Sequence, residues 1–157
     1  ACEKGQQWAL ALACFQEMQG VEVQPSTITY NATLSALEKG GEWELALEML
    51  GHMRRAGVEP NVITCSAAIS ACSKGGEWRP ALGLLQEMQL QGISPDLIAF
   101  SAAVSACERG RQWALALELL RRMQDARLQP DVVGCSAAIS ACEKGGQWEC
   151  ALTLLWG

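Results

Sequence analysis

The apolar positions of the chain follow two helical patterns in alternation. Within residues 28–39 they fall at i, i+4 and i+7, the spacing of one helix face; they are Tyr30, Leu34 and Leu37. Within residues 42–55 they recur at the spacing of a second amphipathic helix; they are Trp43, Ala46, Leu47, Leu50 and Met53. Gly40 and Gly41 separate the two patterns, and Gly57 can supply a left-handed cap after the second. The pattern therefore predicts a helical hairpin.

The hairpin pattern repeats every 35 residues. The segment SAAISACSKGGEW from Ser66 returns as SAAVSACERGRQW from Ser101 and as SAAISACEKGGQW from Ser136. Five tryptophans share this period: Trp8, Trp43, Trp78, Trp113 and Trp148. Four prolines share it too: Pro25, Pro60, Pro95 and Pro130. A fixed period of this length is the signature of a solenoid, in which each unit buries its apolar face against its neighbours. We predict an all-α fold, a right-handed α-solenoid of 35-residue helix–turn–helix repeats.

The period divides the chain into one array of five units. Complete repeats are expected at 27–61, 62–96 and 97–131, flanked by partial repeats at 1–26 and 132–157. Because the chain starts and stops inside a repeat, we expect a fragment of a longer array, with exposed apolar side chains in its first unit, such as Trp8, Leu12 and Phe15. Fraying is expected in the second helix of 62–96, which contains Pro80 and Gly83, and at Arg127, which replaces a capping glycine.

Composition and charge exclude several classes of function. The 157 residues carry a formal net charge of −5, which gives no general attraction to nucleic acid or to anionic lipid. No apolar run approaches the roughly 18 residues of a membrane span, so no membrane partner is expected. The chain contains no nucleophile and base pair, phosphate loop or metal-ligand set. We therefore predict no enzyme activity, no cofactor, no metal and no small-molecule substrate.

The eight cysteines do not have the spacing of a disulfide or zinc framework. Cys65 and Cys72 are seven residues apart on one predicted helix, so their Cα atoms lie about 10 Å apart, beyond the roughly 7 Å limit for a bridge. A second set follows the repeat and is predicted to fill the core: Cys2, Cys72, Cys107 and Cys142. This use of cysteine indicates a reducing compartment. His52, the only histidine, is expected at the surface.

The 35-residue period, the two helices and the Pro–Asp or Pro–Asn joint resemble the pentatricopeptide repeat family over the whole chain. The tetratricopeptide repeat has a 34-residue period and a different tryptophan pattern. The resemblance is to a piece of a longer P-type-like array. It implies binding of single-stranded RNA at about one base per repeat, with the first helices lining the groove. It also implies a role in RNA processing, stability or editing in a mitochondrion or chloroplast.

The resemblance also implies which residues would contact RNA. Aliphatic wedges against the bases would be Ile28, Ile63, Ile98 and Val133. Base-reading polar residues three places later would be Asn31, Ser66, Ser101 and Ser136. Their partners after the next periodic proline would be Asn61 for Asn31, Asp96 for Ser66 and Asp131 for Ser101. Ser–Asp pairs in the family favour guanine, and Asn–Asn pairs favour cytosine and tolerate uracil. We expect these polar groups on the groove face, away from the buried stripe.

Each of these positions also has a structural interpretation. Asp96 and Asp131 are ordinary helix caps by type, as Ser26 and Asn61 are. One cation per repeat ends the first helix and suits either a phosphate or the helix C-terminal dipole; the set is Lys4, Lys39, Lys74, Arg109 and Lys144. The periodic tryptophans are expected to pack helices together instead of stacking on bases. The alternative function is a helical scaffold for protein partners without RNA binding, which the negative charge favours.

Overall fold

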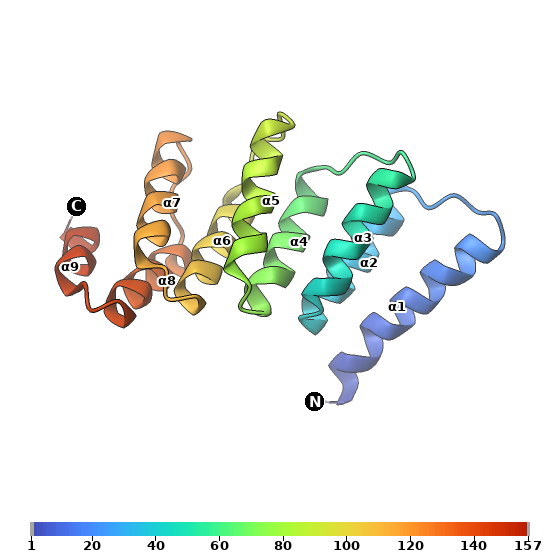
Figure 1. Ribbon diagram of the computed structural model, residues 1–157, viewed down its shortest axis with the longest axis horizontal. Coiled ribbons are helices and arrows are strands. Elements are labelled where there is room, and N and C mark those ends of the chain that lie inside the picture. Colours follow the sequence, from blue (N-terminus) through green and yellow to red (C-terminus); the bar gives the residue numbers. More distant parts are fainter. Residues whose placement is uncertain (1, 157) are drawn as a thin grey trace.

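The computed structural model describes residues 2–156, and the side chains of residues 7–153. This part of the chain is entirely helical, without strands, and the predicted all-α solenoid is confirmed (Figure 1). The helices are α1 (Cys2–Gly20), α2 (Thr27–Gly40), α3 (Trp43–Arg55), α4 (Val62–Lys74), α5 (Trp78–Leu90), α6 (Leu97–Arg109), α7 (Trp113–Asp125), α8 (Val132–Lys144) and α9 (Trp148–Trp156). They succeed one another along the long axis, and the two ends of the chain lie at opposite ends of the array.

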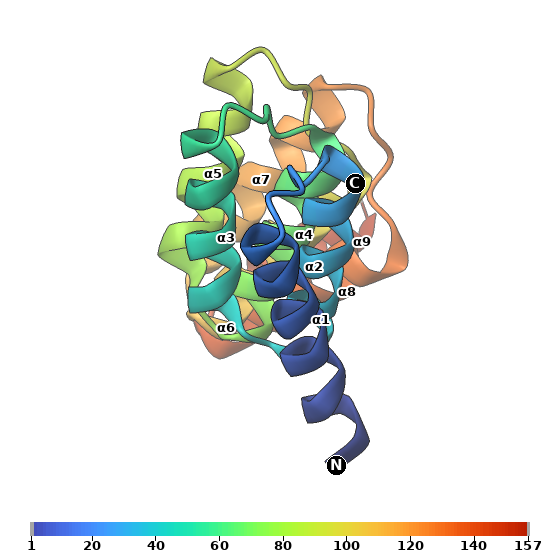
Figure 2. The same ribbon diagram turned by 90° about the vertical axis from the view of Figure 1, so that its right-hand side faces the viewer.

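The helices form two layers. The first helices of the repeats, α2, α4, α6 and α8, make one layer, and the second helices, α1, α3, α5, α7 and α9, make the other. Seen along the long axis, α2 and α4 lie on one side and α3 and α5 on the other (Figure 2). Each first helix packs on the next first helix, whereas among the described residues the backbone of each second helix comes close only to first helices. The first-helix layer is therefore the more closely spaced, and any bend of the array places it on the concave side.

Small side chains explain the close spacing of the first helices. The repeated segment SAAISAC places alanine and cysteine where α4 meets α6 and where α6 meets α8. Ala68, Ala71, Ala103, Ala106, Ala138 and Ala141 are completely buried. Side chains of this size let helix backbones approach closely, because the interaxial distance is set by the residues at the contact. The repetition of SAAISAC thus specifies the spacing between neighbouring repeats.

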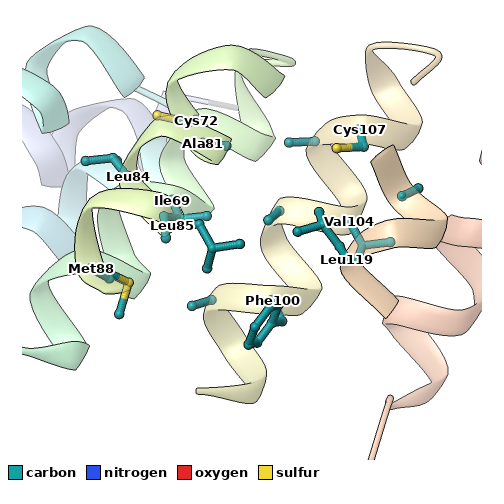
Figure 3. Packing of buried hydrophobic residues seen from close by; sticks show 14 of the residues in the cluster. Ile69, Cys72, Ala81, Leu84, Leu85, Met88, Phe100, Val104, Cys107 and Leu119 are labelled. Carbon is teal, nitrogen blue, oxygen red and sulfur yellow. The ribbon is translucent and has the colours of Figure 1, made fainter. Parts of the chain in front are cut away.

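Larger side chains from the second helices fill the space between the two layers. The helices α3, α5 and α7 each bury one alanine, two large apolar residues and then one methionine; in α5 they are Ala81, Leu84, Leu85 and Met88. They meet Ile69 and Cys72 of α4 and lie beside Phe100 and Val104 of α6 (Figure 3). Burying one leucine or methionine side chain of this kind contributes about 1.5 to 3 kcal/mol to folding. The apolar faces predicted from the spacing are confirmed, including Tyr30, Leu34 and Leu37.

Each periodic tryptophan packs against the next repeat. The indole of Trp78 at the start of α5 lies over Gly110 at the end of α6, where an added Cβ would be 2.1 Å from Cδ1. The same contact joins Trp8 to Gly40, Trp43 to Gly75 and Trp113 to Gly145. The glycine leaves room for the ring. Trp148 makes no such contact within the described chain and is 64% exposed. The expected packing role is thus found in the four tryptophans that precede another first helix.

The two expectations of fraying were wrong. α5 is not frayed, because Pro80 stands in its first turn. Backbone N–H groups in the first turn have no intrahelical acceptor, so proline removes no hydrogen bond there. α7 keeps the 13 residues of α3 and α5, with Arg127 in the left-handed conformation at φ 59°. Ser26 stands at the N-cap of α2 as expected, but its side chain makes no cap bond. α1 is continuous across Gln6, whereas the other repeats turn at this position through a residue of positive φ, such as Gly41 or Arg111.

The first unit also differs from expectation in its aromatic residues. Phe15 is buried and packs at 5.1 Å from the Tyr30 ring and edge-on to His52. His52 is half-buried instead of lying free at the surface. Its two ring nitrogens lie 2.8 Å from Gln19 Nε2 and 2.9 Å from the Tyr30 hydroxyl. Trp8 and Leu12 are also partly covered, so α1 is held to the array by a mixed apolar and polar cluster.

Candidate nucleic-acid interface

A row of exposed aliphatic side chains follows the first-helix layer. Ile28, Ile63, Ile98 and Val133 each stand second in a first helix and are between 59% and 80% exposed. A single exposed aliphatic residue is ordinary, but one at the same position of every repeat forms a regular apolar row. The four predicted wedge residues therefore share one face at the repeat spacing.

Each of two predicted polar pairs is joined by a hydrogen bond. The Ser66 hydroxyl donates to Asp96 Oδ1 at 2.9 Å, and the Ser101 hydroxyl donates to Asp131 Oδ1 at 2.9 Å. The same carboxylate oxygens cap the following helices, accepting from the backbone N–H of Ala99 and of Gly134. The capping interpretation of the aspartates is therefore confirmed at both sites. Both bonds end on Oδ1, which leaves Oδ2 to accept from a ligand.

The serines of these pairs are more buried than expected. Ser66 is 4% exposed and Ser101 is 6% exposed, whereas Ser136 is exposed. The expectation that Ser66 lies away from the buried stripe was wrong. Its burial follows from the close approach of α4 and α6. Asp96 caps α6 and also accepts a hydrogen bond from Ser66, and both bonds form together only if Asp96 lies against Ser66. A larger residue at this position would therefore have to displace its neighbours.

The Asn31 and Asn61 pair is connected differently. Thr64 at the third position of α4 lies between the two asparagines, and its hydroxyl is 2.5 Å from Asn31 Oδ1, the shorter of its two acceptor distances, and 2.9 Å from Asn61 Oδ1. Asn61 Oδ1 accepts from the Thr64 backbone N–H at 3.0 Å, and the Asn61 N–H donates back to the Thr64 hydroxyl at 3.2 Å. Asn61 and Thr64 thus form a reciprocal capping box. Ala99 and Gly134 occupy the Thr64 position in the following repeats and have no side-chain donor.

A depression of about 320 Å³ lies between α4, α6 and α8 on the first-helix layer. Its walls include two wedges, Ile98 and Val133, and the polar pair Ser101 and Asp131. Lys74 and Arg109 lie at its border. The structure thus brings together the three kinds of predicted site residue in one concave place.

The periodic cations connect successive first helices. Lys74 Nζ lies 2.6 Å from Glu38 Oε1, and Lys144 pairs in the same way with Glu108. Ser73 replaces the glutamate in the intervening repeat, and there Arg109 donates to the backbone carbonyls of Ser73 and Lys74 at 2.9 and 2.8 Å. Burial opposes the ionised form of Glu108, but hydrogen bonds from Lys144 and Ser140 and the charges of Lys144 and Arg109 hold its pKa below the usual value. Three of the four proposed phosphate-binding cations therefore already have intramolecular partners, and Lys39 is exposed.

The cysteines and the remaining titratable groups show no second site. Cys72 and Cys107 are fully buried as predicted, and burial raises the pKa of Cys72 to about 11 and that of Cys107 to about 12. Cys142 is also buried, whereas Cys14 is exposed. No cluster of metal-binding side chains occurs within the described residues, and no described helix is long and apolar enough to cross a membrane. The side chains of Cys2 and Lys4 lie outside the described part of the chain.

Sequence reasoning missed two groups of polar residues. Thr64 is the first, and its signal was present as an Asn-x-x-Thr segment, a reciprocal capping pattern at the start of a helix. The second group bridges successive second helices at one repeat position: Gln19 with His52, Arg54 with Glu87 at 2.7 Å, and Gln89 with Arg122. Each bridge joins residues 33 apart in the sequence. Its partners follow the period but differ in chemistry from repeat to repeat, so sequence similarity does not indicate them.

The helical hairpins, the row of wedges and the polar pairs define a class of protein, the arrays of two-helix repeats with one recurrent site per repeat. Three sequence profiles match this chain: the PPR repeat family over residues 25–74, the PPR repeat over 63–93 and the pentatricopeptide repeat domain over 83–145. The chain belongs to the pentatricopeptide repeat family. No curated protein matches the sequence.

Solved structures of this family have the same fold. The PPR domain of protein-only RNase P 1 from Arabidopsis thaliana, in complex with tRNA, aligns with a TM-score of 0.83 at 19% identity, covering 98% of this chain and 81% of that one. The pentatricopeptide repeat protein PPR10 of maize, in complex with an 18-nt psaJ RNA element, aligns with a TM-score of 0.73 at 26% identity. The alignment covers 96% of this chain and 22% of PPR10, so the chain spans about a fifth of that relative.

Proposed function

We propose that this chain binds single-stranded RNA along its first-helix layer, about one base per repeat, as part of a longer footprint. The observation that carries the proposal is the recurrence, in each repeat, of an exposed aliphatic residue beside a short polar pair. An aliphatic wedge covers the face of a base, and the polar pair bonds to its edge. The PPR10 complex with RNA, at 26% identity, supports the same assignment.

The hydrogen bonds suggest which base edge each pair prefers. In the Ser66 and Asp96 pair, the hydroxyl proton and Asp96 Oδ1 are already used, so the atoms left are acceptors. Guanine presents two adjacent N–H donors on its Watson–Crick edge and is the matching base. The Ser101 and Asp131 pair has the same bonds and the same preference. With a pyrimidine at the Asn31 and Asn61 pair, the proposed order is 5′-pyrimidine-G-G-3′, and Ser136 would read a fourth base.

The electrostatics give a moderate role to phosphate contacts. The net charge is −5, and Lys74, Arg109 and Lys144 are engaged by the preceding repeat. Binding would therefore depend on base contacts and show a shallow salt dependence, because few counterions would be released. The same charge balance favours the second candidate, a scaffold that binds protein partners without RNA. We propose no catalytic activity for this segment, and we place it in organellar RNA processing on family membership alone.

Filter binding with pooled single-stranded RNA at several salt concentrations tests the proposal. The doubly substituted Ile63→Ser/Ile98→Ser chain, which removes two proposed wedges, is expected to lose at least about tenfold in affinity, since fully covering one isoleucine side chain contributes about 1.5 to 3 kcal/mol. Leu90→Ser is the matched control, because Leu90 is 80% exposed but lies on a second helix. Equal loss in both variants, or uniform binding of all sequences, would contradict base reading and favour the scaffold.

A further inference from the structure

We propose that Thr64 is a third specificity-determining residue for the base read by Asn31 and Asn61. The inference rests on the function proposed above. Thr64 belongs to the next repeat, and it is completely buried between the two asparagines. Its hydroxyl and its backbone N–H donate to the amide oxygens of the two side chains, which turns both oxygens toward Thr64. The two Nδ2 groups therefore point away from Thr64 and are the amide atoms that we propose a base contacts.

This arrangement makes the pair a donor site. An asparagine amide carries an acceptor on one side and a donor on the other, and free rotation would let it present either. A flip of Asn61 would break the capping bond to the Thr64 N–H and set two donors against each other. A flip of Asn31 would lose the 2.5 Å bond that it accepts from the Thr64 hydroxyl, and that hydroxyl would then have to donate to Asn61 Oδ1, 2.9 Å away, which already accepts from the Thr64 N–H. Thr64 thus fixes the orientation of the Asn61 amide and favours this orientation of the Asn31 amide.

Two fixed donors discriminate between the pyrimidines. Cytosine presents two adjacent acceptors, N3 and O2, and can accept from both Nδ2 groups. Uracil carries a proton on N3, which would face a donor and remain unpaired. A site whose polar groups do not match those of the base disfavours it strongly, so the fixed pair favours cytosine over uracil. If one amide were free to rotate, its oxygen could accept the uracil N3–H, and the discrimination would fall.

The neighbouring repeats show that this control is specific to one site. Ala99 and Gly134 stand at the Thr64 position, and there Ser66 and Ser101 bond directly to the aspartates. A carboxylate has two equivalent acceptors and needs no orienting group. Each amide of an Asn–Asn pair can flip and so exchange its donor and acceptor ends, and it is beside this pair that a threonine stands.

The test compares Thr64→Val with wild type in the full chain. The RNAs are 5′-AAA-N-GG-AAA-3′ with N as C, U, A or G, and binding is measured by equilibrium dialysis at low salt. Wild type is expected to prefer C over U by about tenfold, and Thr64→Val, which keeps the shape but removes the hydroxyl, is expected to bind both within about twofold. Thr64→Ser keeps the hydroxyl and should keep the preference. Thr29→Val is the matched control, since the Thr29 hydroxyl meets only that of Ser26.

The readouts separate a specificity role from a structural one. Selectivity for the adjacent G, measured by replacing it with A, should be unchanged in Thr64→Val, and its circular dichroism should match wild type. If wild type binds no RNA or has no base preference, the proposed function fails and the inference fails with it. If wild type prefers C and G as proposed but Thr64→Val keeps the full C-to-U ratio, only the role of Thr64 is overturned. A loss of selectivity at both positions would assign Thr64 a purely structural role and would also overturn the inference.

Discussion

The two layers of this solenoid use opposite means of holding neighbouring repeats together. First helices meet through alanine, serine and cysteine, so their backbones are close and the polar pairs of successive repeats can bond directly. Second helices carry leucine and methionine, which turn inward and fill the space between the layers. Their backbones stay apart, and side-chain contacts such as the Arg54 and Glu87 pair bridge them. The difference teaches that side-chain size separates a closely packed face, which carries the candidate site, from a supporting face in one repeating sequence.

Substitutions in the Trp–Gly contact, which joins each second helix to the next first helix, should lower the free energy of unfolding the most. Trp78→Ala removes the indole that covers Gly110 and should lower the free energy of unfolding by about 2 to 4 kcal/mol, because a partly buried large aromatic residue is lost. Trp148→Ala at the same repeat position should change it by less than about 0.5 kcal/mol, since Trp148 is largely exposed. Urea unfolding followed by circular dichroism measures both. Equal effects would show that the Trp–Gly contact does not stabilise the array.

Two glycine-to-alanine substitutions, one in this contact and one outside it, should change the free energy of unfolding in opposite directions. Gly110→Ala places a Cβ at 2.1 Å from the Trp78 ring and should destabilise the chain by about 1 to 3 kcal/mol through overpacking. Gly83→Ala, inside α5 with no atom within 4 Å of the new Cβ, should stabilise it by about 0.5 to 1 kcal/mol. Midpoints of urea denaturation distinguish the two. Stabilisation by Gly110→Ala would mean that the indole moves aside freely.

Arg111 tests the turn between the two layers. It adopts φ 57°, where Gly41, Gly76 and Gly146 stand in other repeats. Arg111→Gly should raise the free energy of unfolding by about 0.5 to 1 kcal/mol, because relief of left-handed strain exceeds the added freedom of the unfolded chain. Gly76→Ala should lower it by about 1 to 2 kcal/mol for the reverse reason. Thermal melts of both variants give the signs, and destabilisation by Arg111→Gly would reveal a contact made by the arginine side chain.

The bridges between second helices should give the smallest effect. Glu87→Gln removes the ion pair with Arg54 and should lower the free energy of unfolding by less than about 1 kcal/mol, because both side chains are about one third exposed. The loss should shrink as salt is added. Denaturation at low and high salt measures this change. A larger loss that is independent of salt would show that the second helices depend on this pair for their spacing.

The repeating core could be predicted from the sequence, whereas the contacts of polar groups between repeats could not. Tyr30, Leu34 and Leu37 were placed correctly because helical periodicity alone determines which face is buried. The ionic partner of Lys74 is Glu38 of the preceding repeat, and no residue next to Lys74 in the sequence indicates this partner. That pairing depends on how closely α2 and α4 approach, which is a property of packing between repeats and not of one helix.

The candidate site divides in the same way. The residues proposed as wedges, such as Ile63, follow from the family pattern, which marks a single residue in each repeat; they form an exposed row, and their contact with bases stays a prediction. The burial of Ser66 was missed because it follows from two simultaneous bonds of Asp96, to the serine and to the α6 backbone. The role of His52 was missed because its partners, Gln19 and Tyr30, come from two other helices.

The unlike bridges on the second helices bear on how a chain of near-identical units avoids misassembly. Nearly the same apolar surface is presented by every hairpin, so burial alone would tolerate a hairpin that docks one unit out of order. The bridges would oppose such an error. If the hairpin of residues 27–61 docked on that of residues 97–131 and left out residues 62–96, Arg54 would face Arg122 instead of Glu87. Like charges at that distance repel, and the intended order is favoured. An array that grows by duplication can therefore keep its core sequence constant while a few surface residues preserve the order of its units, and with it the order of any bases they read.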